Sequence, residues 1–174
     1  MQISPSLVSQ IRVLTYGKSE ALQSTPPRNT EEAQYNLAYP VATTLLDGEL
    51  GPAQVLPPRL FDPDIRHLLA KIEVEYSAEF DAIYRSSNEL VKQSRVILRL
   101  ENSPRELNSG VVTPIWECHD PPTDAELENK FHRLVAPVLG AERAEQMARL
   151  VWNFDEDERG NGTRQLIALM TMRN

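Results

Sequence analysis

Thirteen prolines are distributed along the 174 residues of this chain, against only seven glycines. A proline within a helix removes a main-chain hydrogen bond and clashes with the preceding turn, so each proline restricts where a helix can continue. Three pairs, at 26–27, 57–58 and 121–122, favour extended connections. The chain is therefore expected to fold into short elements joined by proline-containing loops.

Charge and residue types exclude several classes of protein. Eighteen basic residues against 25 acidic residues give a net charge of −7, so nucleic-acid binding is not expected. One cysteine, Cys118, and three histidines cannot supply a disulfide framework or a structural zinc site. The sequence shows neither a signal peptide nor an apolar run of about 18 residues, so no membrane partner is expected. We therefore predict a cytoplasmic protein without a metal or cofactor.

The first half of the chain alternates between strand and helix signals. The run at 11–16 is rich in β-branched residues and ends at a glycine, which predicts a strand. Asn29 or Thr30 then caps an apolar helix that continues to Gly48. Because Pro40 lies in its middle, we expect two half-helices that meet near Tyr39.

The remaining segments complete an irregular series of helices and strands. They predict a helix from Asp62, a strand at 72–76, a hairpin at 95–113, and helices at 124–136, 141–154 and around 166–170. The fold class expected from this series is α+β, a two-layer antiparallel sheet with helices followed by C-terminal helices. The predicted division is an α+β domain at 1–136 and a helical extension at 137–174.

Few residues suggest chemistry by their own pattern. Cys118, His119 and Asp120 are adjacent, but catalytic groups are usually assembled from distant positions, so a simple loop is favoured. His67 and His132 are expected to be solvated or locally paired. The acidic run at 155–158 could hold a hard cation, although a solvated helix end explains such a run more often.

Tyr39 is the strongest candidate for a functional position. It lies beside the proline bend of a buried helix, where a phenol can reach a cleft. The alternative is a core tyrosine whose hydroxyl has a main-chain partner, and the sequence leaves both open.

The order and spacing of several segments resemble the C-terminal part of the MmgE/PrpD family. The resemblance runs from about Ile3 to Phe154, and four segments carry it: EEAQYNLAYPVATTLLDGELG, RLFDPDIRHLLAKIEV, the hairpin at 95–113 and TDAELENKFHRLVAPVLGAERAEQMARLVW. Members of the family include 2-methylcitrate dehydratase, cis-aconitate decarboxylase and iminodisuccinate epimerase. The resemblance implies a small di- or tricarboxylate substrate and a lyase or isomerase reaction without a metal.

The resemblance also implies which parts of the chemistry lie elsewhere. Family enzymes have a large helical domain that supplies most of the catalytic histidine, aspartate and lysine residues. Tyr39 matches a tyrosine that borders the substrate in some members, so it is predicted to bind substrate. Two departures are visible: Pro40 follows this tyrosine rather than preceding it, and the loop at 118–122 lacks the usual glycine.

Two classes of function follow from the resemblance. In the first, the chain is the small domain of a lyase or isomerase, and its helical domain is a partner chain or another part of a longer protein. In the second, it is a stand-alone, non-catalytic binding module that covers its apolar face by forming a homo-oligomer. No catalytic residue is assigned in either case.

Overall fold

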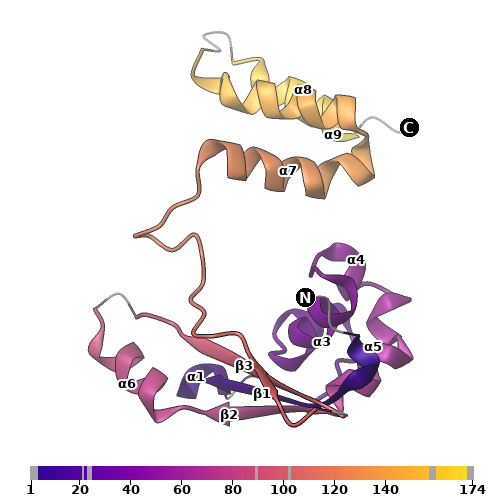
Figure 1. Cartoon of the computed structure of the whole chain (residues 1–174). Coiled ribbons are helices and arrows are strands. Elements are labelled where there is room, and N and C mark those ends of the chain that lie inside the picture. Colours follow the sequence, from indigo (N-terminus) through magenta and orange to yellow (C-terminus); the bar gives the residue numbers. More distant parts are fainter. Residues whose placement is uncertain are drawn as a thin grey trace. The chain divides into compact units, whose positions relative to one another are not determined.

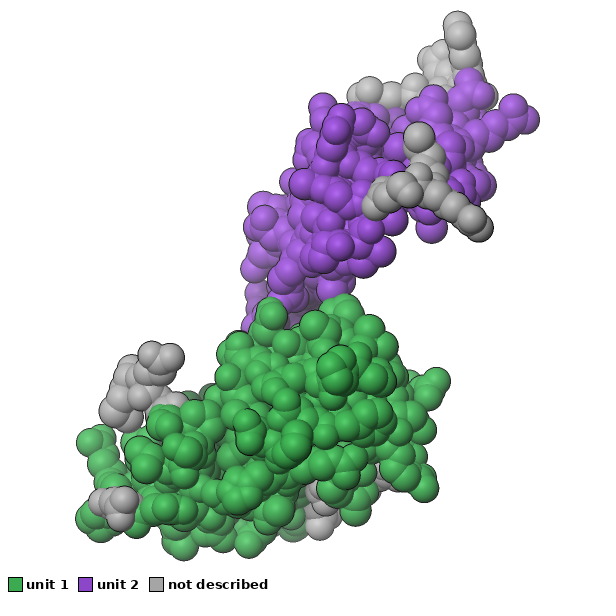
Figure 2. Space-filling view, turned by 90° about the vertical axis from the view of Figure 1, so that its right-hand side faces the viewer, with its two compact units in different colours: residues 1–114 green, residues 115–174 purple. Residues whose placement is uncertain are grey.

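The computed structural model describes residues 4–20, 22, 25–88, 90–101, 103–156 and 160–171. The chain divides into two compact units, Met1–Pro114 and Ile115–Asn174 (Figure 2). Each unit is built from its own elements and is described separately below.

A four-stranded sheet forms the centre of the first unit (Figure 1). Its strands, in the spatial order β2-β1-β3-β4, are β2 (Ile72–Tyr76), β1 (Val8–Thr15), β3 (Ser94–Leu100) and β4 (Glu106–Asn108). The pairs β1·β3 and β3·β4 are antiparallel, whereas β1 and β2 are parallel. The α+β class is confirmed, and the sheet is mixed because the helical connection between β1 and β2 returns the chain in the same direction.

Short helices account for most of the rest of the first unit. They are η1 (Pro5–Leu7), α1 (Gly17–Glu20), α2 (Thr30–Gln34), α3 (Ala38–Asp47), α4 (Pro52–Val55), η2 (Arg59–Phe61), α5 (Pro63–Leu69) and α6 (Ala78–Ser86). The apolar core joins Ile11 and Val13 of β1 to Ala42 of α3 and to Ile65 and Leu68 of α5, all of them almost fully buried. Helices α3 and α5 therefore pack on one face of the sheet.

The predicted bend in the 30–48 helix is a complete break. Helix α2 ends at Gln34 and α3 begins at Ala38, which places Pro40 in the first turn of α3. A main-chain N–H in that turn has no partner within the helix, so the missing N–H of a proline costs little there. The Asn36 side chain supports the new start by accepting a hydrogen bond from the Tyr39 N–H at 2.7 Å.

The hairpin is confirmed, but its returning strand is shorter than the predicted 106–113. Strand β4 ends at Asn108, and pairing resumes only at a single bridge between Ser94 and Val112. Gly110 interrupts the strand because its φ of 73° lies in the left-handed region. The turn residue Asn102 lies outside the described residues.

The second unit consists of helices: α7 (Asp124–Leu139), α8 (Ala141–Trp152), η3 (Phe154–Glu156) and α9 (Gly162–Thr171). The predicted capping box is present, with Glu126 N–H donating to Thr123 Oγ1 and Thr123 N–H donating to the Glu126 carboxylate. The boundary predicted at 136/137 falls within α7. None of the described helices is long and apolar enough to cross a membrane.

Candidate functional site

Tyr39 lies in the core of the first unit, where its side chain is fully buried. Its hydroxyl donates a hydrogen bond to the main-chain carbonyl of Gln54 at 2.5 Å. Gln54 belongs to α4 and is also buried, with an exposed fraction of 7%. The phenol therefore connects the start of α3 to α4, as in the core-tyrosine alternative; the substrate contact predicted for it stays a prediction.

Gln54, at the α4 end of this hydrogen bond, belongs to a polar network. The Gln54 side-chain amide donates to Asp47 at 3.2 Å. Arg59 forms a two-point ion pair with Asp47 and a second ion pair with Asp62, whose carboxylate lies 2.5 Å away. Because Asp47 ends α3, Arg59 begins η2 and Asp62 caps α5, one guanidinium joins three elements.

The network fixes the charge of its members at neutral pH. Burial raises the pKa of the Tyr39 phenol, and although the Arg59 charge opposes this, the net direction is upward. The hydrogen bonds from Arg59 lower the pKa of Asp47, and the Asp64 N–H together with Arg59 lowers that of Asp62. Tyr39 is therefore a proton donor here, and the carboxylates are ionised anchors for Arg59.

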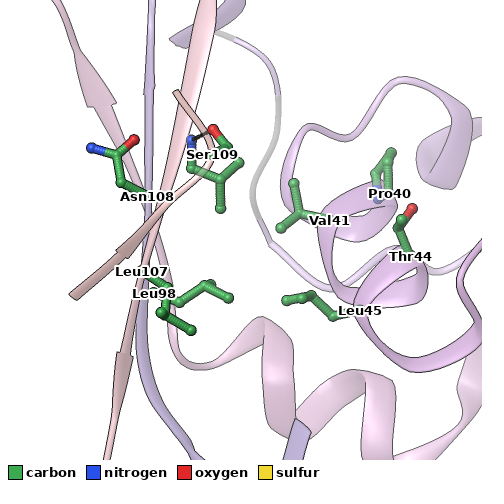
Figure 3. A pocket seen from close by; sticks show the side chains of 9 residues that line it. Pro40, Val41, Thr44, Leu45, Leu98, Leu107, Asn108 and Ser109 are labelled. Atoms are coloured by element: carbon green, nitrogen blue, oxygen red, sulfur yellow. Dashed lines mark hydrogen bonds between the residues drawn. The ribbon is translucent and has the colours of Figure 1, made fainter. Parts of the chain in front are cut away.

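A pocket of about 500 Å³ lies between α3 and the sheet (Figure 3). Val41 and Leu45 of α3 face Leu98 of β3 and Leu107 of β4 across it, with Pro40 at the α3 side. Its lining is almost entirely apolar, and no basic side chain is among the described residues that form it. The pocket suits an apolar group rather than a carboxylate.

The polar residues at the pocket edge are engaged in their own turn. Asn108 Oδ1 accepts the Gly110 N–H at 2.8 Å, and Ser109 Oγ accepts the Val96 N–H at 3.0 Å while donating to the Gly110 carbonyl. These contacts shape the end of β4. They leave few hydrogen-bonding groups aimed into the pocket.

Asp81 of α6 is a buried carboxylate that lies where β1 and β2 end. It accepts hydrogen bonds from Gly17 N–H and the Tyr76 hydroxyl, both at 3.1 Å, and from Arg85 Nε at 2.5 Å. Desolvation raises the pKa of Asp81, but these three donors outweigh it and the net direction is downward. Asp81 is thus a structural anion that joins α1, β2 and α6.

The other sequence candidates do not assemble into a site. Cys118 is an exposed free thiol. His67 is exposed on α5, and His132 is half-buried, 3.5 Å from a carboxylate oxygen of Glu145. Of the acidic run at 155–158, residues 157 and 158 lie outside the described residues. Within the described part of the chain, no group of three or more histidine, cysteine or acidic residues could hold a metal ion.

The described helices of the second unit leave much apolar surface exposed. Only Ala144 and Met147 are buried hydrophobic residues in this unit, as far as it is described. The exposed large apolar residues of its helices are Leu127, Leu134, Val138, Val151, Trp152, Phe154, Ile167 and Met170. So much uncovered apolar surface is typical of an interaction face.

The fold thus defines a small α+β domain followed by amphipathic helices. The chain matches the model of the MmgE/PrpD C-terminal domain over residues 1–156. The chain therefore belongs to the MmgE/PrpD family, of which it contains the C-terminal domain. A search of curated proteins found no match to the chain.

Proposed function

We propose that this chain is the small-domain portion of a MmgE/PrpD-type lyase or isomerase that acts on a small di- or tricarboxylate. The observation that carries the proposal is the match to the C-terminal domain of that family over residues 1–156. The main acid and base groups would come from a helical domain, in a partner chain or in another part of a longer protein. Tyr39 is the residue of this chain that we expect to border the substrate.

The arrangement around Tyr39 supports a specific role for it. A phenol with a raised pKa stays protonated at neutral pH and can donate a hydrogen bond or a proton, but it is a poor base. The hydroxyl is held by the Gln54 carbonyl, so contact with a substrate would require α4 to move. In this proposal, docking of the helical domain displaces α4 and frees the hydroxyl.

The exposed apolar residues of α7, α8 and α9 support the proposal that these helices bind the helical domain. If they do, a charge placed there should prevent association. We would mix the purified chain with the helical domain of a homologue and measure the mass of the complex by light scattering. Val151→Glu should weaken the complex, whereas Gln146→Glu, the same charge on an exposed polar position of α8, should not.

The same exposed residues also support the second candidate function, a stand-alone module that self-associates. In that case the chain alone forms a homo-oligomer, which Val151→Glu dissociates, and adding a helical domain changes nothing. A chain that stays monomeric alone and forms a complex only with the helical domain favours the first proposal. A monomer that binds no helical domain contradicts both.

A further inference from the structure

Two cations lie over adjacent aromatic rings at the end of the sheet opposite to α4 and α5. The guanidinium carbon of Arg95 is 5.5 Å from the centre of the Phe80 ring, and Lys18 Nζ is 5.5 Å from the centre of the Tyr84 ring. Phe80 and Tyr84 are four residues apart on α6, so they share one face of that helix. Each cation therefore lies over a ring that belongs to this one face of α6.

The neighbouring contacts hold Lys18 at this position. The Tyr16 ring stacks on Tyr84 with centroids 4.5 Å apart, and the Gly17 N–H is bound by Asp81 at 3.1 Å. Both contacts fix the main chain of α1 against α6. Arg95 is fixed from β3, whose first residue, Ser94, bonds the hydroxyl of Thr15 at 2.9 Å.

Neither cation has an anionic partner among the described carboxylates. By contrast, Arg12, Arg28, Arg59, Arg85 and Arg99 of the same unit each pair with a carboxylate. The Nε atom of Arg95 is also buried without a hydrogen-bond partner. A buried donor without a partner is costly, and a bound anion would satisfy it.

The position agrees with a general rule for ligand sites. Strands β1 and β2 are parallel, and both end at this edge, immediately before α1 and α6 (Figure 1). In sheets with parallel strands, ligands commonly bind outside the carboxyl ends of those strands. The aromatic rings beneath the cations hold them in place and exclude water on that side.

We propose that Lys18 and Arg95 form a binding site for a small dianion, separate from Tyr39. The guanidinium would bind a carboxylate or phosphate group through two parallel hydrogen bonds, and the ammonium would neutralise the second charge. The site belongs to the first unit alone and does not depend on a helical-domain partner.

Calorimetric titration of the full chain with succinate, inorganic phosphate and acetate at low salt tests this site. We expect saturable binding of one or both dianions and weaker binding of acetate; the tighter dianion identifies the carboxylate or phosphate source. Lys18→Gln and Arg95→Gln should each weaken binding by about tenfold or more. Lys18 is exposed, so its variant should fold normally.

Arg66→Gln is the matched control. The Arg66 guanidinium also lies over an aromatic ring, 5.8 Å from the centre of Phe61, but Arg66 belongs to α5 and lies away from this edge of the sheet. That variant should bind the dianion as the unaltered chain does. Absence of saturable binding to the unaltered chain would overturn the proposal. An equal loss of affinity in Arg66→Gln would also overturn it, since the effect would then be one of net charge.

Discussion

The Tyr39 hydroxyl donates a hydrogen bond to the carbonyl oxygen of Gln54, 15 residues further along the chain. Both residues are buried, so neither group would gain a hydrogen bond from water if this bond were lost. This contact links the start of α3 to α4.

Tyr39→Phe should therefore lower the free energy of unfolding by about 1–3 kcal/mol, because the Gln54 carbonyl would remain buried without its donor. Urea denaturation followed by circular dichroism measures the change. Tyr35→Phe is the control, since Tyr35 is 73% exposed and should change stability by less than about 0.5 kcal/mol. Equal effects of the two variants would mean that the hydroxyl bond contributes nothing.

Two neighbouring threonines of α3 allow a second test of how much a buried hydroxyl hydrogen bond contributes to stability. Thr43 is fully buried and its hydroxyl donates a hydrogen bond to the Tyr39 carbonyl at 3.0 Å, whereas Thr44 is exposed and lines the apolar pocket. Thr43→Val should cost about 1 kcal/mol of stability. Thr44→Val should be neutral or slightly stabilising, because it adds an apolar group beside the pocket. Similar losses in both variants would contradict the assigned positions of these side chains.

Arg59 is expected to be a key residue of the junction between α3, η2 and α5. Arg59→Gln removes charged hydrogen bonds to Asp47 and Asp62 and leaves two carboxylates near each other, so stability should fall by about 1–3 kcal/mol. Combining it with Asp47→Asn in a double-mutant cycle measures the coupling. We expect the double variant to lose less than the sum of the single variants, and strict additivity would argue against the pair.

Asp81 should make stability dependent on pH in the acid range. Its pKa in the folded chain is below the ordinary value of 3.8, so the unfolded chain takes up the proton first as the pH falls. The stability that Asp81 contributes is present above that value and is lost as the pH drops through the lowered pKa. Asp81→Asn should make the free energy of unfolding less dependent on pH below 3.8.

The exposed carboxylate of Glu79, on the same helix, provides the comparison for Asp81. Denaturation curves at a series of acid pH values give the free energy of unfolding as a function of pH. Glu79→Gln should change this pH dependence less than Asp81→Asn does. If the Asp81→Asn curve keeps the full pH dependence of the unaltered chain, the three hydrogen bonds do not stabilise the ionised form.

Local signals in the sequence predicted many of the elements. The capping box at Thr123 and Glu126, and Asp62 before Pro63, act within one helix turn, so the helix starts could be located. The parallel pairing of β1 with β2 was not predicted, since the register Ile11 with Ile72 joins distant parts of the chain. The end of β4 was also missed, because the conformation of Gly110 depends on the turn around it.

The candidate site was predictable only in part. The proline bend and the family resemblance both selected Tyr39 as a candidate, but its partner Gln54 carries no pattern that marks it, and the main-chain carbonyl that Tyr39 binds has no sequence signature at all. Asp81 was missed because 77–94 has little apolar periodicity. Its spacing of four residues from Arg85 is the one signal that could have indicated a paired carboxylate.

Turnover by a reconstituted mixture tests the central claim most directly. The full chain would be combined with the helical domain of a MmgE/PrpD homologue, and conversion of cis-aconitate and of 2-methylcitrate would be followed. The account predicts that the mixture forms a complex and converts at least one of these substrates, while each part alone is inactive. A mixture that forms no complex and converts neither substrate would contradict it.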